Sequence, residues 1–144
     1  MIESVKLPPE LKKKAFSVKQ RKFPHFKVAI SGESKACAYL VQQGYYIVGR
    51  NLTWKHLELD ILAHNQASNE LSFIEVKTRT KQYIPAHLAI NAKKIQNLHR
   101  FAGKFNQLSY QHFRKRYEYT IDAICISLNV DNEISHYKNI SWWR

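Results

Sequence analysis

Two short apolar runs with embedded charges stand in the middle of the chain. Residues 57–64 and 71–79 alternate apolar with polar positions, and the six residues between them are rich in turn formers. This alternation is typical of a β-hairpin, because successive side chains of a strand point to opposite faces. The pattern predicts that charged residues share strand faces: Glu58 with Asp60, and Glu75 with Lys77. Leu59 and Ile61 are expected together on the opposite face of the first strand.

These charges have two interpretations. An unpaired charge on a buried strand face is costly, so such charges are normally paired or bound to an ion. Carboxylates of Asp60 and Glu75 would then form an oxygen-rich site suited to Mg²⁺ or Mn²⁺, and Lys77 would reach a phosphate or a metal-bound water. The alternative is a solvated outer face with ordinary Glu–Lys pairs, which is common in one-sided antiparallel sheets. The residue types alone give the two interpretations similar weight.

The periodicity of the other segments predicts the order α-β-β-β-α-β, followed by one or two short strands. A helix is expected from Ser31, as the N-cap, to Gly44, which puts Glu33 in its first turn, either interacting with the helix dipole or supplying a further metal ligand. The other predicted elements are a strand at 45–50, a polar connection at 51–55, a helix at 86–107, and strands at 118–127, 134–137 and 140–143. These elements together indicate an α/β layer domain with a mixed sheet.

Charge points to a polyanionic partner. The chain has 144 residues, 23 Lys or Arg and 11 Asp or Glu, and a formal net charge of +12. Nucleic acid is the commonest partner of such a protein. Residues 1–30 carry much of this excess and predict a mobile or partly helical basic arm, which leaves 31–144 as the folded domain.

Membrane and secretory classes are not indicated. No apolar run approaches the roughly 20 residues of a spanning helix, and the first residues lack the apolar core of a secretory signal. Cys37 and Cys125 are far apart in apolar contexts, as expected of reduced packing cysteines in a cytoplasmic protein.

Two further residues have both a structural and a functional interpretation. Asp122 lies within an apolar strand, and pairing with a basic residue of 114–116 is favoured over catalysis. Trp54 could stack on a nucleic-acid base, but a half-buried packing anchor is the favoured interpretation.

Several blocks in the correct order resemble the YraN-like family of predicted endonucleases, which are related to Holliday-junction resolvases. The resemblance covers Gly32 to about Ile126. Its blocks are Gly32-Glu33, Arg50-Asn51, Glu58-Leu59-Asp60-Ile61, Phe73-Ile74-Glu75-Val76-Lys77-Thr78-Arg79, Lys94 and Asp122. The chain departs from the family pattern at Leu57, where the family has glycine, and in its longer N-terminal basic segment.

The resemblance implies the PD-(D/E)XK nuclease fold, a restriction-endonuclease-like core in which helices flank a mixed β-sheet. It implies that Asp60, Glu75 and Glu33 hold Mg²⁺ or Mn²⁺, with a backbone carbonyl near Val76, and that Lys77 orients the attacking water. Six other residues would surround these ligands or contact nucleic-acid backbone: Glu58, Arg79, Lys93, Lys94, Arg50 and Asn51.

The expected activity is metal-dependent cleavage of DNA, with branched or structured DNA as one candidate substrate. A homodimer is a further expectation from the resolvase relatives, and Trp142-Trp143 is the candidate apolar patch for it. The alternative is a non-catalytic nucleic-acid-binding module that keeps the nuclease fold.

Overall fold

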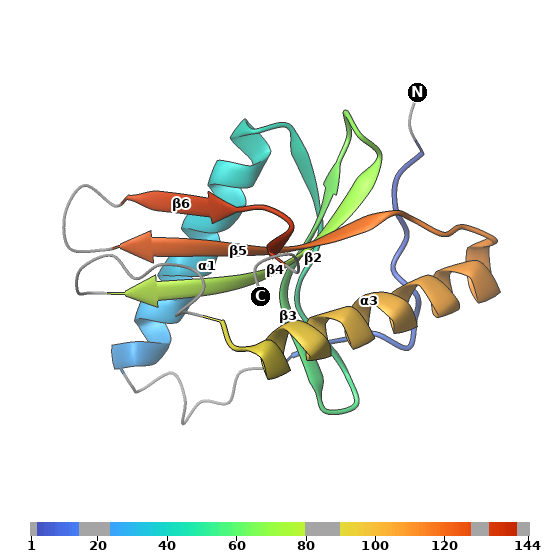
Figure 1. Cartoon of the computed structure of the whole chain (residues 1–144), viewed down its shortest axis with the longest axis horizontal. Helices are drawn as coiled ribbons and strands as arrows, with labels where there is room; N and C mark the ends of the chain where they lie inside the picture. The colour runs from blue at the N-terminus through green and yellow to red at the C-terminus, as the bar shows by residue number, and fades with distance from the viewer. Residues whose placement is uncertain (1–2, 15–23, 80–89, 128–132, 141–144) are drawn as a thin grey trace.

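In the part of the chain that the structure describes, a six-stranded mixed β-sheet is flanked by two helices (Figure 1). The computed structural model describes residues 3–14, 24–79, 90–127 and 133–140. Its elements are β1 (Lys12–Lys13), α1 (Pro24–Gln42), β2 (Tyr45–Trp54), β3 (Leu57–Asn65), β4 (Glu70–Arg79), α3 (Ala92–Phe113), β5 (Tyr119–Ser127) and β6 (Ile134–Tyr137). The strands follow sequence order across the sheet, and only β4 and β5 run parallel. The predicted fold class is confirmed, and the architecture is consistent with a restriction-endonuclease-like core.

Both predicted helix starts are wrong. Helix α1 begins at Pro24, because proline is well suited to the first helical position and no helix-breaking residue intervenes before Ser31. Ser31 is therefore not an N-cap, and Glu33 lies in the interior of the helix. Helix α3 begins after Asn91, whose side-chain oxygen accepts a hydrogen bond from Lys94 N at 2.8 Å, and it ends at Phe113.

Strand β2 is also longer than expected. It continues through the segment predicted as a polar connection and ends at Trp54, so only Lys55 and His56 separate it from β3. Trp54 is partly buried and packs against the core, as expected of an anchor. Lys55 has a φ of 54°, which is the left-handed conformation that a tight turn requires.

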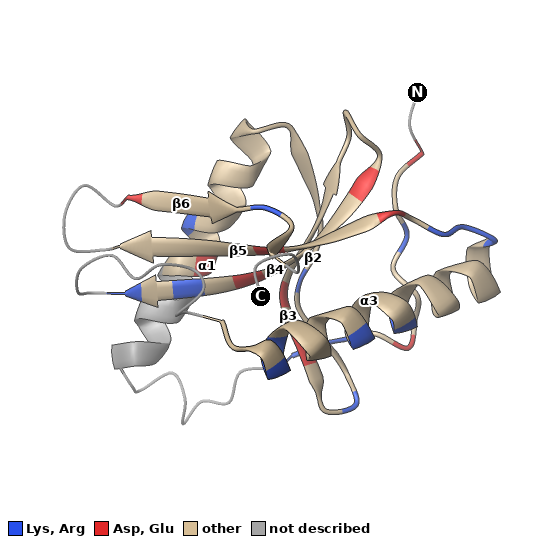
Figure 2. Cartoon of the chain, in the orientation of Figure 1, with Lys and Arg blue, Asp and Glu red and all other residues tan. Residues whose placement is uncertain are grey.

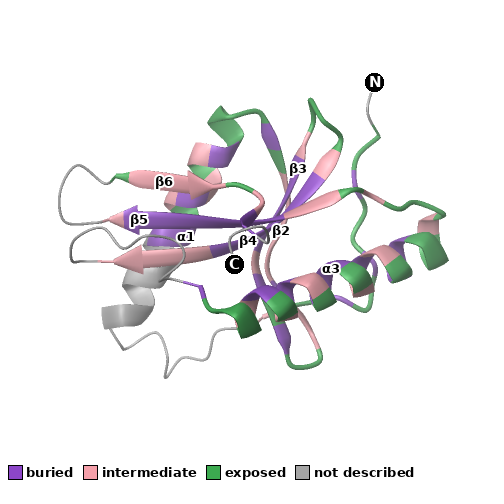
Figure 3. Ribbon diagram, in the orientation of Figure 1, coloured by how far each residue is buried: buried purple, intermediate pink, exposed green. Residues whose placement is uncertain are grey.

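Separate cores lie on the two faces of the sheet. Helix α3 contributes one side of the first core, with Leu98, Phe101 and Phe105 fully or almost fully buried against strand residues such as Phe73. Helix α1 covers the second core through residues such as Leu40. Figure 3 shows buried positions concentrated in the central strands and on the side of α3 that faces the sheet. Each helix therefore fixes one face of the sheet by burial of its apolar stripe.

The described part of residues 1–30 packs on the domain. Val5 and Leu11 are buried in the first core, and β1 extends the sheet by pairing with β2. Residues 3–14 thus form an edge of the fold, whereas the sequence predicts a mobile or partly helical arm over 1–30, of which 15–23 lie outside the described residues. At the other end of the chain, the strand predicted at 140–143 and the Trp142-Trp143 patch lie largely outside the described residues.

Strands β3 and β4 separate halfway along their length. Their pairing runs from Asn65↔Glu70 to Ile61↔Ile74, after which β3 stays with β2 and β4 continues beside β5. Leu59 packs in the core under α3 and Ile61 in the core under α1, so the prediction that they share a face is wrong. The break in alternation coincides with the point where β3 leaves its partner. It places Asp60 at the opening between the two strands.

The two cysteines agree with the sequence prediction, and Asp122 does not. Cys37 and Cys125 are free thiols, as predicted. Asp122 does not pair with a basic residue of 114–116. It is almost completely buried and contacts His136 Nε2 at 2.8 Å, Thr120 Oγ1 at 2.8 Å and Asn139 N at 3.0 Å. Asp122 therefore joins β5 to β6 and the segment after it.

Within the described ranges, no helix has the length and apolar character needed to cross a bilayer.

Replacing Asp122 with alanine should destabilise the fold by about 3–5 kcal/mol, because three partly buried polar groups would lose the buried carboxylate that they share. Urea unfolding monitored by circular dichroism would measure the change. The matched control is Glu58→Ala, since Glu58 forms an exposed ion pair worth less than about 1 kcal/mol. Equal losses in the two variants would contradict a structural role for Asp122.

Candidate functional site

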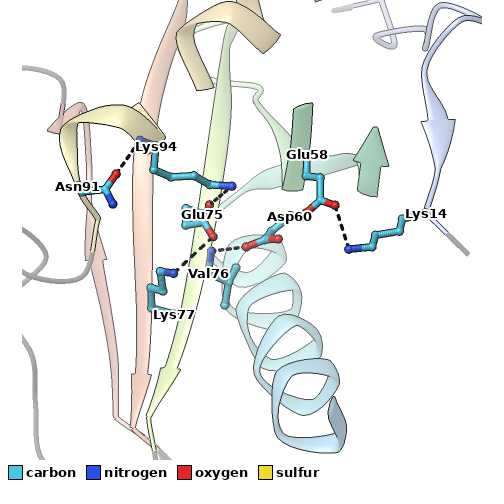
Figure 4. A network of polar contacts seen from close by, with 8 residues as sticks. All are labelled: Lys14, Glu58, Asp60, Glu75, Val76, Lys77, Asn91 and Lys94. Atoms are coloured by element: carbon cyan, nitrogen blue, oxygen red, sulfur yellow. Dashed lines mark hydrogen bonds and ion pairs between the residues drawn. The ribbon is translucent and has the colours of Figure 1, made fainter. Parts of the chain in front are cut away.

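The opening between β3 and β4 brings two carboxylates together (Figure 4). Asp60 comes from β3 and Glu75 from β4, and both side chains lie where the strands no longer pair. Val76 N donates a hydrogen bond to Asp60 Oδ2 at 2.8 Å. This bond takes the place of a missing strand-to-strand bond and fixes Asp60 beside Glu75. The Val76 amide thus has a structural role at the site.

Two lysines lie against Glu75. Lys94 Nζ from α3 is 3.0 Å from Glu75 Oε2, and Lys77 Nζ from β4 is 3.9 Å from Oε1. The Lys94 contact is an ion pair without hydrogen-bond alignment, and Oε2 has no hydrogen bond within the described ranges, so its lone pairs are available for another ligand. The Glu75 side chain is 9% exposed, whereas about a third of each lysine side chain reaches solvent. The site therefore opens to solvent on the side of the ammonium groups.

Burial and neighbouring charge alter the titration of Asp60. Removal of the carboxylate from water raises its pKa to about 7, and the charge of Glu75 acts in the same direction. The Val76 N–H and the charge of Lys94 oppose this rise in pKa, but they do not cancel it. A proton or a cation is therefore favourable at Asp60 near neutral pH.

Glu33 lies near Asp60 and comes from α1, which packs on the face of the sheet opposite to α3. Helix α1 lies very close to β4 at Gly32, where a Cβ atom would stand 1.9 Å from Thr78 Oγ1. Only glycine permits this approach, which brings the next residue, Glu33, toward Asp60. Burial raises the pKa of Glu33 to about 7, with a further contribution from the charge of Asp60. Its Oε1 atom is buried and has no hydrogen-bond partner among the described residues.

Arg50 and Asn51 contact Glu33 and its neighbours from β2. The charge of Arg50 and the side chain of Asn51 both lower the pKa of Glu33, although burial outweighs them. The β2–β3 register shifts between Ile47 and Gly49, and Asn51 has a φ of 51°. This irregular stretch of β2 turns the Arg50 and Asn51 side chains toward α1, where Arg50 Nη2 also lies 3.4 Å from Ser34 Oγ.

Three other predicted residues lie outside this cluster. Glu58 is exposed and forms a 3.0 Å ion pair with Lys14, which sequence reasoning did not identify as a site neighbour (Figure 4). The partners are 44 residues apart, and no local pattern signals their contact. Arg79 donates to the neighbouring Thr78 carbonyl oxygen, and Lys93 is exposed beside Lys94.

The acidic cluster, defined as Glu33, Asp60 and Glu75, has the chemistry of a hard-cation site but is not closed around one. Its potential ligands are all carboxylate oxygens, which suit Mg²⁺ and Mn²⁺. Within the described ranges, no three His, Cys, Asp or Glu side chains already stand close enough together to ligate one metal ion. The structure thus brings the predicted acids into one neighbourhood without gathering three of them as ligands of one ion.

Relatives in several bacteria are similar to this chain. A protein of Caldicellulosiruptor saccharolyticus is 38% identical over 106 residues, which cover 72% of this chain and 85% of the relative. A Pelobacter propionicus protein is 34% identical over 109 residues, covering 75% and 77% of the two chains. A Parabacteroides distasonis protein is 43% identical over 68 residues, and that match spans about half of each chain, 46% of this one and 54% of the relative. All three are described as UPF0102 proteins.

The model of "Uncharacterised protein family UPF0102" matches residues 32–126. The matched range begins at the close contact of α1 with β4 and ends in β5, so it contains every residue of the acidic cluster and both lysines beside it. The chain belongs to the UPF0102 family, which is the YraN-like group.

Proposed function

We propose that the protein is a metal-dependent endonuclease that acts on DNA. The observation that carries this proposal is the pair of carboxylates, Asp60 and Glu75, held side by side at the strand opening with Lys77 and Lys94 next to them. Clustered acids repel phosphate unless a cation lies between them, so a surface that only bound nucleic acid would gain nothing from this arrangement.

The residues present fit a divalent cation. Asp60 and Glu33 both have a raised pKa because each is buried near another acid, and a cation would relieve that repulsion. Among the described residues, neither the buried Oε1 of Glu33 nor Oε2 of Glu75 has a hydrogen-bond partner. Asp60 and Glu75, with Glu33 from α1, would hold the ion. A bound Mg²⁺ or Mn²⁺ would lower the pKa of its water and offset charge on the scissile phosphate.

Groups of the protein itself would position the two carboxylates and the substrate phosphate. Lys94 neutralises Glu75 and limits its movement through the 3.0 Å ion pair. Lys77 is farther from Glu75 and partly exposed, so its ammonium can donate to a phosphate oxygen or orient the attacking water. The Val76 amide keeps Asp60 in place, so that little reorganisation is needed when substrate arrives.

The choice of DNA rests on charge and on family resemblance. A net charge of +12 favours a polyanion, and the family resembles Holliday-junction resolvases, which makes branched DNA the first substrate to test. A homodimer would match the two equivalent strands of a four-way junction.

A non-catalytic nucleic-acid-binding module is the second candidate. It is favoured by the observation that, in the part of the chain that the structure describes, no three potential ligands are already gathered for a metal ion. In this second function Lys77 and Lys94 would serve only to neutralise Glu75 inside a fold inherited from nucleases.

Cleavage assays separate the two candidates. With Mg²⁺ or Mn²⁺, wild-type protein should nick branched or linear DNA, and Asp60→Ala and Lys77→Ala should each lower the rate by about 100-fold or more. Asp60→Ala removes a carboxylate that would hold the cation, and Lys77→Ala removes a positive group near the developing charge. Gel analysis of labelled substrates gives the rates, and circular dichroism checks folding. Lys115→Ser is the control, since Lys115 is exposed and paired with Glu3 outside the cluster. Wild-type protein that binds DNA but cleaves none of these substrates would favour the module.

The raised pKa values predict an unusual dependence of stability on pH in the absence of metal. The folded protein holds protons on Asp60 and Glu33 up to about pH 7, whereas the unfolded chain releases them near the ordinary pKa values of 3.8 for Asp and 4.5 for Glu. This contribution to the free energy of unfolding should therefore fall as pH rises from about 4 to about 7 and stay low above it.

Asp60→Asn should remove much of that dependence and stabilise the metal-free protein at pH 8 by about 1–3 kcal/mol. Urea unfolding in EDTA at several pH values gives the comparison. Added Mg²⁺ or Mn²⁺ should raise the melting temperature of wild-type protein at pH 8 more than that of Asp60→Asn. A wild-type protein as stable at pH 8 as at pH 5 in EDTA, with no response to either ion, would argue against a cation site.

A further inference from the structure

Helix α3 has several basic side chains and no acidic ones. Its 22 residues contain two Lys at its start, Arg100 and Lys104, and no Asp or Glu. At 3.6 residues per turn, Lys93, Asn97, Arg100 and Lys104 lie within a narrow arc of the helix surface. We call these four residues the α3 stripe. Figure 2 shows the basic positions distributed along α3, with the β2–β3 turn nearby.

Two of the three cations of the α3 stripe are not neutralised within the described structure, whereas the third, Lys104, donates to Gln107 Oε1 at 3.3 Å and lies near the carboxylate of Glu10. Lys93 and Arg100 are exposed, and neither has an acidic partner among the described residues. Arg100 and Lys104 are four residues apart, a spacing at which like charges repel on a helix. Lys94, which lies off the stripe, is paired with Glu75 instead. The stripe thus presents unmatched charge at Lys93 and Arg100, and it begins beside Lys94, the residue that contacts Glu75 of the acidic cluster.

The Trp54 ring brings a cation of α3 and a cation of the β2–β3 turn close together. Lys104 Nζ lies 4.7 Å from the centroid of the Trp54 ring, and so does Lys55 Nζ from the β2–β3 turn. Two ammonium groups from segments far apart in sequence are therefore held at one aromatic side chain. Positive charge is continuous from the start of α3, beside Glu75, to the turn at Lys55.

We propose that the α3 stripe is a track for the phosphate backbone of one strand of duplex DNA and leads that strand to the acidic cluster. This inference rests on the proposed action on DNA. At 1.5 Å per residue, Lys93 and Arg100 are about 10 Å apart along the helix, and Arg100 and Lys104 about 6 Å. These separations match about three and two nucleotides of one strand at 3.4 Å each. Asn97 adds a donor between the first two cations.

The basic group after α3 differs in its contacts and supplies the control. Lys115 Nζ is 3.0 Å from Glu3 Oε2, and the guanidinium groups of Arg114 and Arg116 stack on the ring of Tyr110. These cations already have partners within the protein. Lys115→Ser therefore changes the net charge by the same amount as a stripe variant without altering the track.

Salt-dependent DNA binding tests the track. Full-length wild-type, Lys93→Ser, Arg100→Ser and Lys115→Ser proteins would be titrated onto a labelled duplex of about 30 base pairs in EDTA, which prevents cleavage, with fluorescence anisotropy as the readout. For duplex DNA, the slope of log affinity against log salt should lose about 0.9 for each phosphate contact removed. Lys93→Ser and Arg100→Ser should each show this loss, so that the drop in affinity between about 50 and 200 mM salt shrinks by about threefold. Lys115→Ser should keep the wild-type slope.

The outcomes distinguish this inference from the nuclease proposal. Stripe variants that match wild type in slope and affinity would overturn the track, as would an equal effect of Lys115→Ser, which would show that net charge alone matters. Wild-type protein that fails to bind the duplex both in EDTA and in Mg²⁺ would overturn it as well. Reduced slopes in both stripe variants, together with absence of cleavage by wild type in Mg²⁺ or Mn²⁺, would support the track and refute the nuclease activity. Circular dichroism of each variant confirms that its fold is intact.

Discussion

The hydrogen bond from Val76 N to Asp60 Oδ2 is the interaction on which the site depends. This bond lies where the pairing of β3 with β4 ends, after Ile61↔Ile74. The Val76 amide has no β3 carbonyl to bond there, and without Asp60 it would be an unpaired, partly buried donor. A side-chain carboxylate satisfies the amide, and in doing so it is held beside Glu75. Strand divergence, backbone satisfaction and the pairing of two acids are therefore one structural event.

Holding acids together in this way costs stability, and the surrounding elements reduce that cost only in part. Burial and mutual repulsion raise the pKa of both Asp60 and Glu33, while Lys94 and Arg50 act against the rise. Helix α1 contributes Glu33 only because Gly32 allows close contact with Thr78, although glycine in a helix interior is unfavourable by roughly 0.5–1 kcal/mol. Unfavourable local features maintained by a well-packed sheet are typical of a site kept for function.

The charge of the protein is divided between two adjoining regions of opposite sign. The acidic cluster sits in the sheet opening, and the unpaired cations of α3 begin beside it and continue toward Trp54. A phosphate backbone would be attracted by the helix and repelled by the cluster unless a cation were present there. This arrangement joins the proposed binding surface to the proposed chemistry, since the same ion would permit close approach and assist cleavage.

The sequence by itself determined the hairpin, the apolar side of α3, the fold class and the family, because these depend on local periodicity and on motif spacing. It also singled out Asp60, Glu75 and Lys77. Only tertiary structure decided that Glu33 reaches the cluster from a helix interior, that Lys94 is nearer to Glu75 than Lys77 is, and that Asp122 pairs with His136. These contacts join residues from different elements, and the point where β3 leaves β4 follows from pairing across the whole sheet. The alternation of apolar and polar residues along one strand does not show where its pairing with the neighbouring strand ends.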